Sequence, residues 1–161
     1  MTGTPSIVFL HGQDSSGQGT KGRFLRARVP NLLAPDFAGS LDDRMRRMED
    51  LLAPVTHPLI LVGSSFGGLM AAAFAIRHPD RLRRLVLLAP AFDATHPSPL
   101  PSKPLDMPVF LCIGQRDSVT PPAVVLPVAR RLFSCLEIRE VDDDHLLHAH
   151  FRELEWASLL S

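Results

Sequence analysis

Short apolar runs alternate along the chain with longer segments in which apolar residues recur every three or four positions. The short runs predict strands and the longer segments predict helices, because the two structures repeat their side chains with different periods. Strands are expected at residues 7–10, 59–62, 85–88, 109–113 and 136–141, with a weaker one at 32–34. This alternation predicts an α/β fold with a mostly parallel sheet of about six strands, covered by helices on both faces.

Two of the helical segments carry clear start and stop signals. Residues 40–53 begin with Ser40, a preferred N-cap, and two acidic residues follow in the first turn. Residues 66–77 are nearly all small or apolar, which is typical of a helix packed closely on a sheet, and a proline follows shortly after them.

The second half of the chain is less regular. A helix is expected from residue 121 or 122 to 133, with a kink or an interruption at Pro127, and a last helix over roughly 148–160. The proline-rich stretch 91–107 fits neither period. It is expected to be a loop of stiff, extended segments.

The bulk composition narrows the class of protein. With 161 residues the chain is expected to form one domain, residues 1–161. Seventeen Lys and Arg balance seventeen Asp and Glu, so no overall field attracts nucleic acid or a membrane as a partner. No apolar run reaches about 18 residues and no leader pattern is present, which predicts a cytoplasmic protein. Cys112 and Cys135 lack metal or redox spacing and are expected to be buried free thiols.

The most distinctive motif follows the strand at 59–62 and reads Gly63-Ser64-Ser65-Phe66-Gly67, a Gly-x-Ser-x-Gly pattern. A strand that turns sharply into a helix holds one side chain up at the sheet edge, in a strained and crowded backbone. Gly63 and Gly67 stand at the two places where a Cβ would strike the neighbouring strand or helix. The motif therefore predicts Ser65 as a nucleophile.

An acid and a histidine follow this serine. Asp117 lies in a turn just beyond the fourth strong strand, and His145 lies beyond the fifth. Since the carboxyl ends of parallel strands share one edge of the sheet, Ser65, Asp117 and His145 can converge there. His145 would take the serine proton as general base, and Asp117 would accept the other imidazole N–H and set the tautomer. Asp93 is the reserve acid and His148 the reserve base.

A tetrahedral intermediate also needs hydrogen-bond donors for its oxyanion. The backbone N–H of Phe66, directly after the serine, is one candidate. The second is the N–H of Gln13, in the turn after the first strand, where Gly12 lets the backbone approach closely. His11 in the same turn is expected to hold the loop by hydrogen bonds.

Other motifs compete for a functional interpretation. Gly17, Gly19 and Gly22 fit G-x-G-x-x-G, with Asp36 near the place of a ribose-binding acid, but several residues separate them from the preceding strand. They are expected to form a flexible rim instead. Residues 142–144 are three aspartates, but a hard-cation loop spreads its ligands at alternate positions, so no metal site is predicted. A fold that binds a ligand without turnover stays open as an alternative.

Taken together, these motifs resemble those of the α/β-hydrolases. The resemblance rests on the Ser65 motif, the His11-Gly12 turn, the stretch 78–90, the turn 114–122 and Asp144-His145, and covers nearly the whole chain. Residues 11–16 are similar to those of small bacterial esterases of the YqiA type. The resemblance implies a three-layer α/β-hydrolase fold that lacks the first two strands and the helical cap, and hence a shallow, open site. It also implies a serine esterase that cleaves small or accessible carboxylic esters, or thioesters, through an acyl-enzyme, with no cofactor and no metal.

Overall fold

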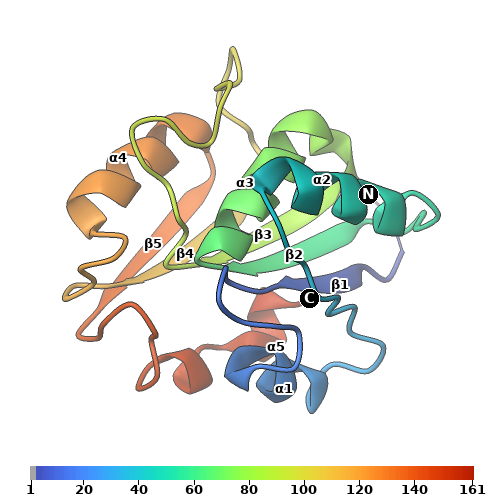
Figure 1. Cartoon of the computed structure of the whole chain (residues 1–161), viewed down its shortest axis with the longest axis horizontal. Helices are drawn as coiled ribbons and strands as arrows, with labels where there is room; N and C mark the ends of the chain where they lie inside the picture. The colour runs from blue at the N-terminus through green and yellow to red at the C-terminus, as the bar shows by residue number, and fades with distance from the viewer. Residues whose placement is uncertain (1–2) are drawn as a thin grey trace.

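The computed structural model describes residues 3–161 and contains a sheet of five parallel strands in the order β1-β2-β3-β4-β5 (Figure 1). The strands are β1 (Ser6–Leu10), β2 (Leu59–Ser64), β3 (Leu82–Leu88), β4 (Val109–Gly114) and β5 (Leu136–Val141). The weak strand predicted at residues 32–34 is instead a single parallel bridge between Leu33 and Val8. Pro35 follows it and has no N–H to extend the ladder, so the sheet has five strands rather than about six.

Helices cover both faces of the sheet and produce the three layers that the sequence predicts (Figure 1). One face carries α2 (Leu41–Leu52), α3 (Phe66–Arg77) and α4 (Pro122–Leu132), and the other carries α1 (Thr20–Arg26) and α5 (Trp156–Leu159). The buried side chains divide in the same way. Leu61 and Leu85 pack with the first group of helices, whereas their neighbours Val62 and Val86 pack with the second. The central strands are therefore buried on both sides, as is usual in a parallel sheet.

The two best-marked helices form where the sequence predicts them. The Ser40 hydroxyl oxygen accepts a hydrogen bond from the Asp43 N–H at 3.1 Å, and the Asp43 carboxylate accepts one from the Ser40 N–H at 3.0 Å. This reciprocal cap satisfies two N–H groups that the first turn of α2 cannot bond internally. Helix α3 begins directly after Ser65 and ends before His78.

Helix α4 runs past Pro127 without a break, so of the two outcomes predicted there, a kink or an interruption, the interruption does not occur. Pro127 removes only the helical bond to the carbonyl of residue 123. The buried face of Val125, Leu126 and Ala129 outweighs that loss because it packs on the sheet.

The chain end differs more from the prediction. In place of one helix over 148–160 the structure has a short 3-10 turn at Phe151–Glu153 and the four-residue helix α5. The Asp143 carboxylate accepts hydrogen bonds from the Ala149 and His150 N–H groups, and the Trp156 indole donates to the Phe151 carbonyl. These bonds compete with a continuous helix.

The remaining segments agree with the predictions only in part. The stretch 91–107 has no helix or strand, as predicted, and α1 has no counterpart among the predicted helices. Cys112 is buried as predicted, whereas Cys135 is exposed, because it lies in the turn before β5. No helix among residues 3–161 has the length and the apolar composition that a bilayer crossing requires.

Candidate active site

Ser65 stands where β2 turns into α3, in a backbone conformation with φ 55° and ψ −115°. A Cβ on Gly63 would strike the Gly67 carbonyl, and a Cβ on Gly67 would strike the Leu10 carbonyl. The turn is held from the next strand, since the Ser65 N–H donates to the Leu88 carbonyl at 2.9 Å. The close approach that the sequence predicts for both glycines is therefore present. These surrounding contacts hold Ser65 in its positive-φ conformation.

Three side chains from distant parts of the chain meet at this turn. The imidazole Nε2 of His145 lies 3.0 Å from the Ser65 hydroxyl, and its Nδ1 lies 2.8 Å from the Asp117 carboxylate. Asp117 follows β4 and His145 follows β5, so both reach the carboxyl edge of the sheet. The Asp117 side chain has no exposed surface, whereas 19 % of the His145 side chain is exposed.

The Asp117 carboxylate is fully engaged as an acceptor. One oxygen accepts from the N–H groups of Val119 and Thr120 at 2.9 and 2.7 Å, and the other lies 2.8 Å from the Thr120 hydroxyl. This hydroxyl is also 3.1 Å from the His145 Nδ1. Thr120 is a site residue that the sequence analysis misses, although the spacing Asp-x-x-Thr is typical of a turn closed by side-chain hydrogen bonds.

The candidate oxyanion donors lie beside the serine. A Cβ on Gly12 would be 3.6 Å from the Ser65 Cβ, and Gln13 and Ser65 line one cleft. Neither the Gln13 nor the Phe66 N–H donates to another group within the described part of the chain.

His11 holds the turn, as predicted. It is buried, and its Nε2 accepts a hydrogen bond from the Phe37 N–H at 2.8 Å. Its proton therefore sits on Nδ1, which donates to the Gly12 carbonyl at 2.6 Å.

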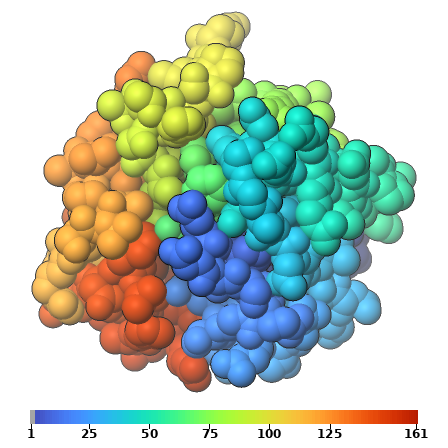
Figure 2. All heavy atoms as spheres, in the orientation of Figure 1, coloured from blue at the N-terminus to red at the C-terminus, as the bar shows by residue number. Residues whose placement is uncertain are grey.

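The cleft above Ser65 has a volume of about 450 Å³ and a mixed polar and apolar lining that includes Asp14, Lys21 and His148. Most of its lining comes from residues 9–22 and 145–148, two segments that adjoin on the face shown in Figure 2, and Ser64, Ser65 and Val119 complete it. The Lys21 ammonium group donates to the Leu146 carbonyl at 2.7 Å. Burial lowers the pKa of Lys21, and the charges of the nearby aspartates 143 and 144 partly oppose that shift.

The alternative site residues are not assembled in the same way. Asp93 lies elsewhere and accepts from the N–H groups of Thr95 and His96. His148 lines the cleft, but His145 makes the bond to the serine.

The glycine motif and the aspartate run also have local roles. The Gly17 N–H donates to Asp36 at 2.8 Å, and Gly22 lies inside α1. Gly22 packs closely on the Gly17 carbonyl and lines the Ser65 cleft with Thr20 and Lys21, so this segment lies at the rim of the cleft, and its flexibility stays a prediction. Asp142 pairs with Arg116 at 2.9 Å.

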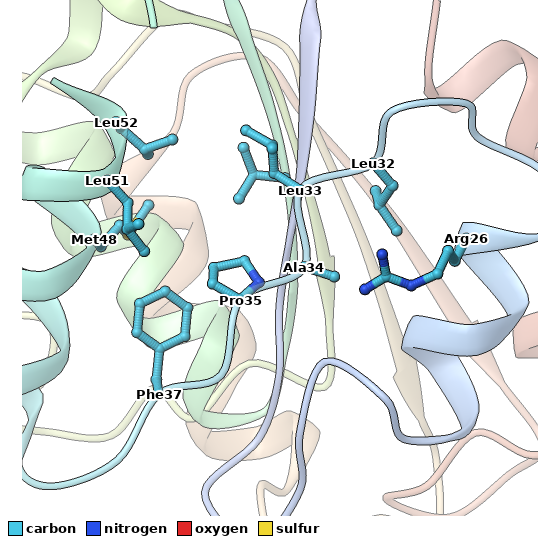
Figure 3. Close-up of a pocket in the computed structure, with 10 residues that line it drawn as sticks. Arg26, Leu32, Leu33, Ala34, Pro35, Phe37, Met48, Leu51 and Leu52 are labelled. Atoms are coloured by element: carbon cyan, nitrogen blue, oxygen red, sulfur yellow. The ribbon is translucent and has the colours of Figure 1, made fainter. Parts of the chain in front are cut away.

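A second, more apolar pocket of about 290 Å³ lies between residues 32–37 and α2 (Figure 3). Leu33 and Pro35 face Met48 and Leu51 across it. It shares no lining residue with the Ser65 cleft.

Known proteins resemble this chain both in sequence and in structure. The human (Lyso)-N-acylphosphatidylethanolamine lipase is 28% identical over 123 residues, which are 74% of this chain and 33% of that protein. The 2-hydroxymuconate semialdehyde hydrolase of Pseudomonas sp. (strain CF600) is 68% identical over 31 residues, 19% of this chain and 11% of that protein. The chain thus spans a third or less of the curated relatives that it matches.

Among solved structures, the Alpha/beta hydrolase domain-containing protein 10 from mouse superimposes with a TM-score of 0.78 at 22% identity, covering 98% of this chain and 88% of that one. The monoacylglycerol lipase of Paleococcus ferrophilus gives 0.71 at 18% identity, covering 98% and 96%. The family model described as "Serine aminopeptidase, S33" matches residues 8–106, more than half of the chain. The chain therefore belongs to this S33 family and has the α/β-hydrolase fold.

Proposed function

We propose that this hydrolase-family protein is a serine esterase that cleaves small or accessible carboxylic esters through an acyl-enzyme on Ser65. The observation that carries the proposal is the continuous hydrogen-bonded chain from the Ser65 hydroxyl through both nitrogens of His145 to the buried Asp117 carboxylate. Two of the similar proteins are named as lipases, which are ester hydrolases.

The hydrogen bonds set the direction of proton transfer. The Asp117 carboxylate accepts hydrogen bonds from the Val119 and Thr120 N–H groups and from the Thr120 hydroxyl. Because a carboxylate can only accept, the His145 Nδ1 must donate to it, and the imidazole proton therefore lies on Nδ1. The lone pair of Nε2 then faces Ser65. As the serine oxygen bonds to the acyl carbon, its proton moves to Nε2, and that proton later goes to the leaving alkoxide. A water molecule activated by the same nitrogen then releases the acid and restores the serine.

The Gln13 and Phe66 N–H groups would stabilise the negative oxygen of the tetrahedral intermediates. Both are fixed before the reaction by the local backbone, and a preorganised donor of this kind lowers the barrier by about 3 kcal/mol. The cleft of about 450 Å³ lies within the size range of small-molecule sites. The same atoms would cleave a thioester.

A fluorophosphonate probe tests the nucleophile. We expect it to label the natural protein and Ser134→Ala, in which an exposed serine is removed, and to leave Ser65→Ala unlabelled. Hydrolysis of p-nitrophenyl acetate should follow the same pattern. Equal labelling of the natural protein and Ser65→Ala would remove the assignment, and an unlabelled, inactive natural protein would favour a binding module without turnover.

A further inference from the structure

A buried arginine stands behind the candidate oxyanion turn. Arg44 lies in the first turn of α2, and only 2 % of its surface is exposed. Among residues 3–161 no carboxylate lies within ion-pair distance of it, although Asp14 is near enough to interact through space. Burying a guanidinium without a direct carboxylate partner is unfavourable. The contacts of Arg44 therefore indicate what this buried charge does.

Arg44 touches both residues that carry the candidate oxyanion donors. Its Nη2 donates to the Gln13 carbonyl at 3.2 Å, and its guanidinium carbon lies 4.8 Å from the centre of the Phe66 ring. Its Nε donates more weakly to the Gly39 carbonyl at 3.4 Å. The buried Nη1 has no hydrogen-bond partner among the described residues.

We propose that Arg44 is a positioning residue for the oxyanion hole, holding the Gln13 turn and the Phe66 side chain in the geometry that the tetrahedral intermediate requires. The inference rests on the proposed esterase function. It assigns to Arg44 no contact with the substrate, since its hydrogen bonds go to backbone carbonyls of the turn and of Gly39.

The peptide geometry of the turn explains how Arg44 can orient the Gln13 N–H. The Gly12 carbonyl and the Gln13 N–H belong to one peptide plane and point in opposite directions. His11 binds that carbonyl at 2.6 Å, and Arg44 binds the carbonyl of the following peptide. Both peptide groups of Gln13 are therefore held, which restricts the direction of its N–H. A donor fixed in advance needs no reorganisation when charge develops.

The positive charge of Arg44 also favours the tetrahedral intermediate. A guanidinium stays cationic at neutral pH even when burial lowers its pKa, as it does here. A fixed cation behind the turn stabilises the negative intermediate more than the neutral ester, because the interaction strengthens away from bulk water.

The test compares Arg44→Met with Arg46→Met. Arg46 lies on the same helix, its side chain is 72 % exposed and it pairs with Asp43 at 2.7 Å, so it provides a matched control away from the turn. We expect Arg44→Met to lower kcat for p-nitrophenyl acetate about tenfold or more with little change in KM, a part of the 10²–10³-fold loss for a whole donor. Arg44→Lys should recover part of the loss, and Arg46→Met should match the natural protein.

A trifluoromethyl ketone separates positioning from a general structural role. Ser65 adds to its carbonyl carbon, the serine proton moves to His145, and the carbonyl oxygen becomes an oxyanion in the site. We expect Arg44→Met to weaken this inhibitor by the factor lost from kcat, while thermal unfolding still shows a fully folded protein at the assay temperature. A kcat within twofold of the natural protein, or an equal loss in Arg46→Met, would overturn the inference.

A readout independent of turnover keeps this inference distinct from the esterase proposal. The proton and nitrogen shifts of the Gln13 amide should both change in Arg44→Met but not in Arg46→Met. An inactive natural protein with these changes would refute the esterase and keep the positioning role. An active protein whose Gln13 amide is unchanged in Arg44→Met would refute the positioning role alone.

Discussion

The replacement Asp117→Asn tests the proton geometry most directly, because the surrounding N–H groups dictate how the new amide must lie. Two backbone N–H groups, from Val119 and Thr120, donate to one carboxylate oxygen at 2.9 and 2.7 Å. The amide oxygen has to take that place, which leaves the amide NH₂ facing His145. The imidazole Nδ1 must then accept, so its proton moves to Nε2 and points at Ser65, where a lone pair is needed.

The size of the effect follows from the same contacts. Flipping the amide to restore the tautomer would lose two hydrogen bonds and set NH₂ against two donors, at a cost of about 3 kcal/mol or roughly a hundredfold in population. The variant also loses the negative charge that stabilises the imidazolium. Together we expect kcat to fall about 10⁴-fold, equivalent to about 5.5 kcal/mol of barrier.

Turnover of p-nitrophenyl acetate at pH 8 by the natural protein, Asp117→Asn and Asp93→Asn provides the assay, with thermal unfolding to show that each variant is folded. Asp93 is a matched control, because it also accepts backbone N–H bonds but its side chain is 58 % exposed and lines no part of the Ser65 cleft. The reasoning is refuted if Asp117→Asn keeps activity within about tenfold, or if Asp93→Asn loses as much.

Two further predictions concern the surroundings of the site. Burial alone would raise the pKa of Asp143, but hydrogen bonds from His150 and from backbone N–H groups outweigh it and hold the pKa below its usual value. The folded-state pKa is thus depressed, so the ionised carboxylate stabilises the fold at neutral pH. Asp143→Asn should therefore lower the free energy of unfolding, measured by urea titration, by about 1–2 kcal/mol at pH 7. This difference between the two proteins should shrink as the pH falls below about 4. Burial raises the pKa of Cys112 to about 11, whereas Cys135 is exposed. Iodoacetamide at pH 8 should therefore modify Cys135 and spare Cys112 until the protein is unfolded, which peptide mass spectrometry would show. Equal modification of both cysteines in the native protein would contradict the burial of Cys112.

Local patterns in the sequence were sufficient to predict much of this protein. The Ser40 cap, the small-residue helix after Ser65 and the five apolar strands depend on neighbours within a few positions, so periodicity and capping residues identify them. The predicted helix at 148–160 fails because Asp143 and Trp156 offer its backbone other partners.

The sequence by itself determined where the apolar runs lie, that a glycine-flanked serine ends one of them, and which later turns hold an aspartate and a histidine. Only the tertiary structure decided the contacts between segments far apart in the chain. Thr120 beside His145 and Arg44 behind Gln13 are examples, and neither residue has a local pattern that names its partner. The physical reason is that such contacts depend on the order of strands in the sheet and on which helices share a face, both set by burial across the whole chain.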